Sequence, residues 1–210
     1  MVGRHSKKAR GQSRRYARKP SVWSEIRGYL LTVIAVMLVV LLGRTFVFNV
    51  YVIPSRSMED TLQIGDRVFA SRLTPRLFTL HRGDIIVFKD PADWMEGEQL
   101  PTNLMSIIDS NRYLIKRVIG LPGDVITLDE DGVVTVNGQT LDEPYVDELA
   151  LGECDIKFPY QVPENRYFVL GDHRATSIDS RSSVIGCVEK SQVVGRVFLR
   201  IWPLNRFAVF

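Results

Sequence analysis

The sequence predicts a mainly β protein, in which an all-β domain follows one N-terminal transmembrane helix. Three features support this prediction. A basic tail precedes an uncharged apolar segment, short apolar or alternating segments fill the remaining chain, and Gly-Asp, Asp-Gly and Asn-Gly pairs separate those segments. A chain of 210 residues is long enough to give such a domain its own hydrophobic core.

Residues 1–27 are predicted to form a basic cytoplasmic tail. They contain nine Lys and Arg residues and one acidic residue, Glu25, whereas the remaining chain contains 18 basic and 23 acidic residues. A basic tail can bind nucleic acid or anionic lipid. Because an apolar segment follows directly, we expect anionic headgroups of a membrane as its partner, and no nucleic acid. The positive-inside rule places such a tail in the cytoplasm.

Residues 28–50 are the predicted transmembrane anchor. Residues 28–43 carry no charge, and the chain stays apolar beyond Arg44, whose long side chain can reach the membrane interface. The sequence around Arg44 lacks the small residues of a signal-peptide cleavage site, so the anchor is expected to stay attached. A helix buried in a protein core is the alternative. With the anchor, the chain is a single-pass protein of the cell membrane, and residues 51–210 are extracytoplasmic.

Residues 51–210 are predicted to form the β-rich domain. Seven segments with apolar or alternating sequence between turn signals are the predicted strands: 67–71, 84–88, 113–119, 124–128, 133–136, 167–170 and 193–202. The pair Asp131-Gly132 predicts a hairpin between the fourth and fifth of these strands. Residues 90–111 and 141–165 are predicted loops.

The predicted strand 113–119 contains a lysine in an unusual place. Side chains of a strand alternate between its faces, so Lys116 shares one face with Leu114 and Val118. Strands this apolar are usually buried on both sides. Burial lowers the pKa of a lysine, and a neutral amine can act as a base. A lysine on an exposed edge strand is the alternative.

Two further polar stretches are candidates for chemistry. Residues 53–62 contain Ser55 and Ser57, which on their own are typical of an ordinary turn. Residues 171–181 combine acidic, basic and hydroxyl side chains, and a buried ion pair within them would support one side of a site. A nucleophilic serine needs a base. Residues 51–210 offer the lysine above and two histidines, so a Ser-His-Asp triad with His81 or His173 stays open.

The sequence predicts no metal and no cofactor. No group of His, Cys, Asp and Glu has the spacing of metal ligands, and no Gly-rich phosphate loop is present. Two cysteines, Cys154 and Cys187, lie in the predicted extracytoplasmic region, where a disulfide can form. Their spacing leaves that bond open, because bridging depends on the distance between the two residues.

Taken in order, the Ser57 stretch, the strand with Lys116 and the stretch 171–181 resemble the motifs of the bacterial type I signal peptidases (leader peptidases). These are a Ser/Lys protease family, and the resemblance is to their single-anchor form. Residues 53–58 are similar to the nucleophile motif, residues 116–124 to the base motif and residues 171–181 to the distal motif. The resemblance covers the anchor and most of the extracytoplasmic domain. Three positions depart from residues that are frequent in the family: Arg56, Asp60 and His173.

The resemblance implies a signal-peptidase-like β catalytic domain and a membrane-bound serine endopeptidase. Such an enzyme removes signal peptides from secreted preproteins after small-x-small sequences, without a cofactor. Ser57 corresponds to the nucleophile and Lys116 to the general base of a Ser/Lys dyad. Ser55, together with the nucleophile's own N–H, corresponds to an oxyanion-hole donor. The remaining positions correspond to a residue that orients the lysine and to a structural ion pair with a neighbouring arginine: Ser177, Asp179, Arg181 and Arg117.

Two other functions compete with this interpretation. A membrane-anchored transpeptidase of the sortase type would use Cys187, although the residues around this cysteine lack the expected Thr-x-Thr-Cys-like context. An anchored β domain that only binds partners would need no nucleophile. Thiol alkylation would inactivate the first alternative, and loss of Ser57 would leave the second unaffected.

Overall fold

The computed structural model describes residues 22–46, 48–59, 61–89 and 113–210. The chain divides into two compact units, residues 1–41 and 42–210. Helix α1 spans Val22–Phe46, and its described side chains are exposed and mostly apolar. None of the helices in the described residues combines the length and apolarity needed to cross a membrane.

The predicted anchor, residues 28–50, does not coincide with one helix. Helix α1 begins six residues earlier, at Val22, and residues 48–50 belong to strand β1, Phe48–Val52. Both segments are apolar and no Pro or Asn-Gly pair separates them, so hydropathy does not mark the boundary. In the structure, β1 differs from the helix by the alternating exposure of its side chains, with Tyr51 buried and Val50 and Val52 exposed.

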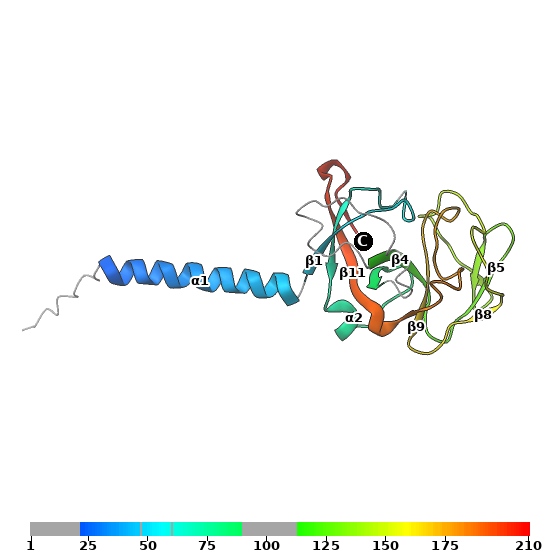
Figure 1. Cartoon of the computed structure of the whole chain (residues 1–210), viewed down its shortest axis with the longest axis horizontal. Coiled ribbons are helices and arrows are strands. Elements are labelled where there is room, and N and C mark those ends of the chain that lie inside the picture. The colour runs from blue at the N-terminus through cyan, green and yellow to red at the C-terminus, as the bar shows by residue number, and fades with distance from the viewer. Residues whose placement is uncertain (1–21, 47, 60, 90–112) are drawn as a thin grey trace, which may run out of the picture. The chain divides into compact units, whose positions relative to one another are not determined.

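The larger sheet is antiparallel throughout its described strands, in the order β1-β2-β11-β3-β4-β9-β10, with β12 paired to β11 (Figure 1). Besides β1, its strands are β2 Arg67–Ser71, β3 Ile85–Lys89, β4 Tyr113–Gly120, β9 Arg166–Leu170, β10 Val188–Glu189, β11 Val193–Trp202 and β12 Ala208–Val209. A short helix, α2, spans Thr74–Leu77, and 3-10 turns cover Lys190–Gln192 and Leu204–Arg206.

The smaller sheet has the order β7-β6-β5-β8. Its strands are β5 Val125–Leu128, β6 Val134–Val136, β7 Gln139–Thr140 and β8 Tyr160–Gln161. β5 and β6 pair antiparallel on either side of Asp131-Gly132, which confirms the predicted hairpin. Gly132 has φ +85°, a conformation that favours glycine in this turn.

Most of the predicted strands are confirmed. β2 and β11 have the predicted bounds, and the other five predicted strands agree within one residue at each end. The prediction missed β1, β7, β8, β10, β12 and α2, and the expected loop 141–165 contains β8. The expected loop 90–111 lies outside the described residues.

The central strands β3 and β4 are buried on both faces, as predicted for β4. Ile85 and Val87 belong to one hydrophobic cluster, and Ile86 and Phe88 belong to another on the opposite face. β4 is buried without interruption from residue 115 to residue 120. Any polar side chain on this part of β4 therefore lies in the interior of the domain.

Candidate active site

Ser57 lies on a turn that the hydrophobic core holds in place. Its neighbour Met58 is 1 % exposed, and Ile53 and Leu62 on either side are also buried in the same cluster. Ser57 itself is half-buried, and its Oγ lies 3.3 Å from Ser55 Oγ, within hydrogen-bond distance. The apolar anchors fix the turn, while the hydroxyl groups of the two serines stay at the surface.

A buried carboxylate closes the other end of this segment. Asp66 accepts hydrogen bonds from the Gln63 backbone N–H (2.9 Å), from Arg206 Nη1 (3.0 Å) and from Arg200 Nη1 (3.3 Å). Arg200 Nη1 also donates to the Thr61 carbonyl (2.5 Å). Strand β11 and the chain end thus brace the segment that carries Ser57.

Lys116 lies on β4, opposite Ile86 of β3, and is 3 % exposed. Its Nζ donates a hydrogen bond to Ser177 Oγ at 2.9 Å. Burial lowers the pKa of Lys116 from 10.5 to about 8; Asp179 acts against this change, and other charges nearby have smaller effects. At pH 8 about half of such amines are neutral, compared with about 0.3 % at the ordinary pKa.

The loop at residues 171–181 is built around a fully buried ion pair. Arg181 donates to both carboxylate oxygens of Asp179, from Nε and from Nη2, each at 2.8 Å. Its remaining N–H groups donate to backbone carbonyls, among them that of Leu151 (2.6 Å). Burial raises the pKa of Asp179, but the Arg181 guanidinium and the Lys116 ammonium outweigh this effect and hold that pKa below its ordinary value. The pair is thus charged and saturated with hydrogen bonds.

Gly171 is the point at which these segments meet. A Cβ atom here would lie 2.2 Å from Ser177 Oγ and 2.4 Å from the Ser57 carbonyl oxygen, so no larger residue fits without movement. The backbone N–H of His173 donates to the same Ser57 carbonyl (3.2 Å). The Ser57 backbone and the hydroxyl that binds Lys116 are therefore close neighbours.

The described contacts do not include a direct bond between Ser57 and Lys116. Within the described residues, Ser57 Oγ contacts Ser55 and Lys116 Nζ binds Ser177. The expected dyad therefore stays a prediction.

The other candidate nucleophiles and bases are not assembled. The His81 side chain is exposed and its Nδ1 lies 3.9 Å from Asp84, while His173 Nδ1 lies 2.8 Å from Thr176 Oγ1. Neither ring forms a hydrogen bond with Ser57 in the described part of the chain. Both cysteines are free thiols, and burial raises the pKa of Cys187, which makes it a poorer nucleophile. The described residues hold no group of side chains suited to a metal ion.

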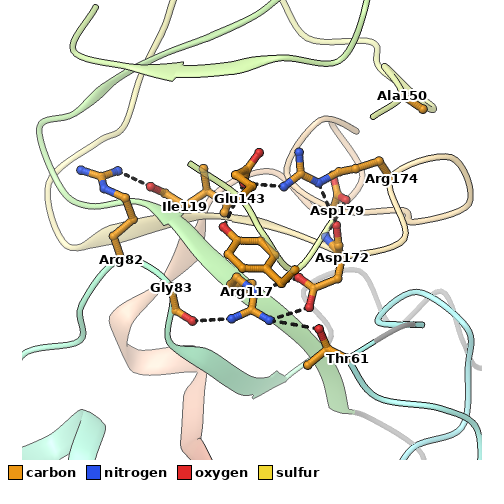
Figure 2. A network of polar contacts seen from close by, with 12 residues as sticks. Thr61, Arg82, Gly83, Arg117, Ile119, Glu143, Ala150, Asp172, Arg174 and Asp179 are labelled. Atoms are coloured by element: carbon orange, nitrogen blue, oxygen red, sulfur yellow. Dashed lines mark hydrogen bonds and ion pairs between the residues drawn. The ribbon is translucent and has the colours of Figure 1, made fainter. Parts of the chain in front are cut away.

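Arg117 has a different partner from the expected one. It binds Asp172 through two parallel hydrogen bonds, Nε to Oδ1 at 2.8 Å and Nη2 to Oδ2 at 2.6 Å, and it does not join the Asp179–Arg181 pair (Figure 2). A second buried pair, Glu143–Arg174 at 2.5 Å, lies in the same network (Figure 2). No role was predicted for Glu143, Arg174 or Asp172, because nothing in one sequence indicates which acid faces which arginine.

Comparison with known proteins identifies a family for this chain. Residues 26–202 match the family model described as signal peptidase, peptidase S26. A probable signal peptidase I-2 from Synechocystis sp. is 37 % identical over 186 residues, 89 % of this chain and 76 % of the relative. A signal peptidase I from Leptolyngbya laminosa is 38 % identical over 175 residues, 82 % of this chain and 78 % of the relative.

A solved signal peptidase I from Enterococcus faecalis V583 aligns with a TM-score of 0.39 and 29 % identity, over 56 % of this chain and 96 % of that one. The family model covers most of the sequence, including the three motif-like stretches 53–58, 116–124 and 171–181. The relatives are matched over more than two thirds of their length. The chain therefore belongs to the signal peptidase family, peptidase S26, as a type I signal peptidase of the bacterial kind and a serine peptidase.

Proposed function

We propose that this chain removes signal peptides from exported preproteins, with Ser57 as nucleophile and Lys116 as general base. The observation that carries the proposal is the buried Lys116 amine, whose pKa is about 8 and whose Nζ binds Ser177 beside the Ser57 backbone. A structural lysine would gain more from a carboxylate partner than from a hydroxyl. A hydroxyl leaves the amine free to become neutral.

In the proposed mechanism, Ser57 rotates about χ1 from Ser55 toward Lys116. The neutral amine takes the Ser57 proton as Oγ attacks the carbonyl carbon of the substrate. The Ser57 N–H and the Ser55 hydroxyl donate hydrogen bonds to the developing oxyanion. The Lys116 ammonium then protonates the leaving amine, and the neutral amine activates a water molecule that hydrolyses the acyl-enzyme. In this scheme Ser177 orients the amine, and the Asp179–Arg181 pair holds its loop.

The dyad predicts the effects of four substitutions. Ser57→Ala and Lys116→Ala should each reduce cleavage of a preprotein by at least about 10³-fold while the fold is retained, because both halves of the proton transfer are needed. Lys116→Arg should be equally inactive, because a guanidinium does not release its proton at working pH. Ser55→Ala should lower kcat by about 10²–10³-fold, since one oxyanion donor is lost. Gel-based assays measure cleavage of the preprotein, and circular dichroism shows whether each variant keeps its fold. Full activity of Lys116→Ala would contradict the proposal.

We further propose that the enzyme cuts after small-x-small sequences, as the family resemblance implies. Shallow pockets would admit side chains of the size of alanine and exclude larger ones by steric overlap. In a panel of signal peptides varied at the two small positions, Ala→Leu should lower kcat/KM by at least about 10²-fold at each. Equal cleavage of peptides with bulky residues would rule out this specificity.

We also propose that the part of residues 28–50 that belongs to helix α1, which ends at Phe46, anchors the chain in the cell membrane. Residues 1–27 would be cytoplasmic, and strand β1 with the catalytic part that follows it would be extracytoplasmic. Support comes from the exposed apolar side chains of α1 and from the basic tail, which suits anionic headgroups. An enzyme and a signal peptide held in one membrane would meet at a raised effective concentration.

Alkaline carbonate extraction of membranes from cells that produce the chain tests the anchor. The chain should stay in the membrane pellet, and protease added to spheroplasts should digest the region after residue 50 while the tail stays protected. A peripheral control protein should be released by the same treatment. Release of the chain into the carbonate supernatant would contradict the anchor without affecting the assignment of the dyad.

A further inference from the structure

We propose that Glu143 and Tyr145 are positioning residues of the reaction. Residues 143–145 form a strap that holds two arginines, Arg117 and Arg174, against the loop beside Ser57. The strap thereby sets the alignment of the nucleophile with the strand that carries Lys116. This inference rests on the proposed function, since it takes Ser57 and Lys116 as the reacting pair.

The first arm of the strap acts on Arg117. This arginine follows Lys116 on β4, binds Asp172 in the 171–181 loop through two hydrogen bonds, and donates from Nη2 to Thr61 Oγ1 at 3.3 Å. Thr61 lies four residues after Ser57 in the segment that carries the nucleophile. One guanidinium thus joins the strand of the base, the loop beside the nucleophile and the nucleophile's own segment.

Tyr145 fixes the plane of that guanidinium. The Arg117 Cζ atom lies 3.8 Å from the centre of the Tyr145 ring, so the ring covers one face of the planar group. The Tyr145 hydroxyl donates to Glu143 Oε1 at 2.9 Å, which holds the ring in turn. The guanidinium makes four hydrogen bonds, two to Asp172, one to Thr61 and one from Nη1 to the Gly83 carbonyl at 2.9 Å. Because the bonds of a planar group share one orientation, a tilt of Arg117 would shift all of its partners together.

The second arm acts on Arg174. Glu143 Oε1 accepts a hydrogen bond from Arg174 Nη2 at 2.5 Å, and Arg174 Nε donates to the Gly171 carbonyl at 3.0 Å. The Nη1 group of Arg174 is buried and has no hydrogen-bond partner in the described part of the chain. Among the described side chains, Glu143 alone binds this guanidinium. Gly171, the backbone group that Arg174 holds, packs directly against the Ser57 carbonyl and Ser177 Oγ.

Both arms therefore end at residues 171–173, which contact the Ser57 backbone. Neither Glu143 nor Tyr145 belongs to the hydrophobic clusters of the domain. Loss of a strap contact should thus disturb the alignment of the reacting groups more than it weakens the core. Reaction rates are sensitive to such alignment, because a displacement of about 1 Å can reduce a rate by about 10²-fold.

Two substitutions of Tyr145 test the stacking arm. Turnover of a signal-peptide substrate is measured with the purified full chain in detergent, and kcat is expressed per active site titrated with a serine-acylating reagent. Tyr145→Leu removes the ring from Arg117 and should lower kcat by about tenfold or more, with KM within about twofold. Tyr145→Phe keeps the ring over Arg117 and loses the hydrogen bond to Glu143, so a fall in kcat of about two- to threefold is expected.

Glu143→Gln tests the Arg174 arm, with Glu189→Gln as the matched control. Glu189 forms a solvent-exposed ion pair with Arg166 where β10 pairs with β9, and its described hydrogen bonds and ion pair do not involve residues 171–173. Glu143→Gln should lower kcat by about tenfold or more, and the control should stay within about twofold. Thermal melting of every variant shows whether it is folded. If Glu143→Gln fails to fold, the two Tyr145 variants still test the role of the strap.

The outcome that overturns the proposal is wild-type kcat per titrated site in Tyr145→Leu, whatever its melting temperature. A residue with a purely structural role would reduce the number of titratable sites and leave the turnover of each site unchanged. Ser57→Ala and Lys116→Ala in the same assay separate the two proposals. If both are inactive and Tyr145→Leu turns over normally, only the strap is wrong, whereas activity in either would remove the proposed function itself.

Discussion

The arrangement of this site depends on one constraint, which is the placement of a lysine amine in the interior of a β domain. A charged ammonium without a partner is costly to bury, and the group responds by a fall in its pKa. Lys116 is 3 % exposed and binds one hydroxyl group, that of Ser177. Its nearest carboxylates are themselves occupied by arginines, so they stabilise the ammonium only in part.

The ion pairs around the lysine share one arrangement, in which an arginine binds a buried acid. Arg181 binds both carboxylate oxygens of Asp179, Arg117 binds both of Asp172, and Arg174 binds Glu143, so each of these three acids has its own guanidinium. Buried pairs of this kind add little net stability compared with apolar residues. They do specify geometry, because a guanidinium binds in one plane. In this domain they define the loop that packs against the Ser57 backbone, where Gly171 leaves no space for a side chain.

Much of this could be predicted from the sequence, and the limits have physical causes. The two-sided apolar pattern of 113–119 predicted a buried Lys116, and the Gly-Asp and Asp-Gly pairs helped to locate β2 and the β5–β6 hairpin. β1 was missed because its apolar residues continue those of α1 without a break. The partner of Arg117 lies 55 residues away at Asp172, and the sequence contains other acidic residues that could pair with an arginine equally well. Glu143 was missed for the same reason, since long-range ion pairs leave no local pattern.

The most direct test of this account is the pKa of the Lys116 amine in the full chain. Lysine labelled with ¹³C at Cε reports the charge of each amine by NMR, and Lys116→Met identifies the resonance. We expect a midpoint of about 8, so that the Lys116 amine loses its proton well before an exposed lysine with a pKa near 10.5. A midpoint close to 10.5 would mean that the amine is charged at working pH, and the chemistry assigned to Ser57 and Lys116 would fail.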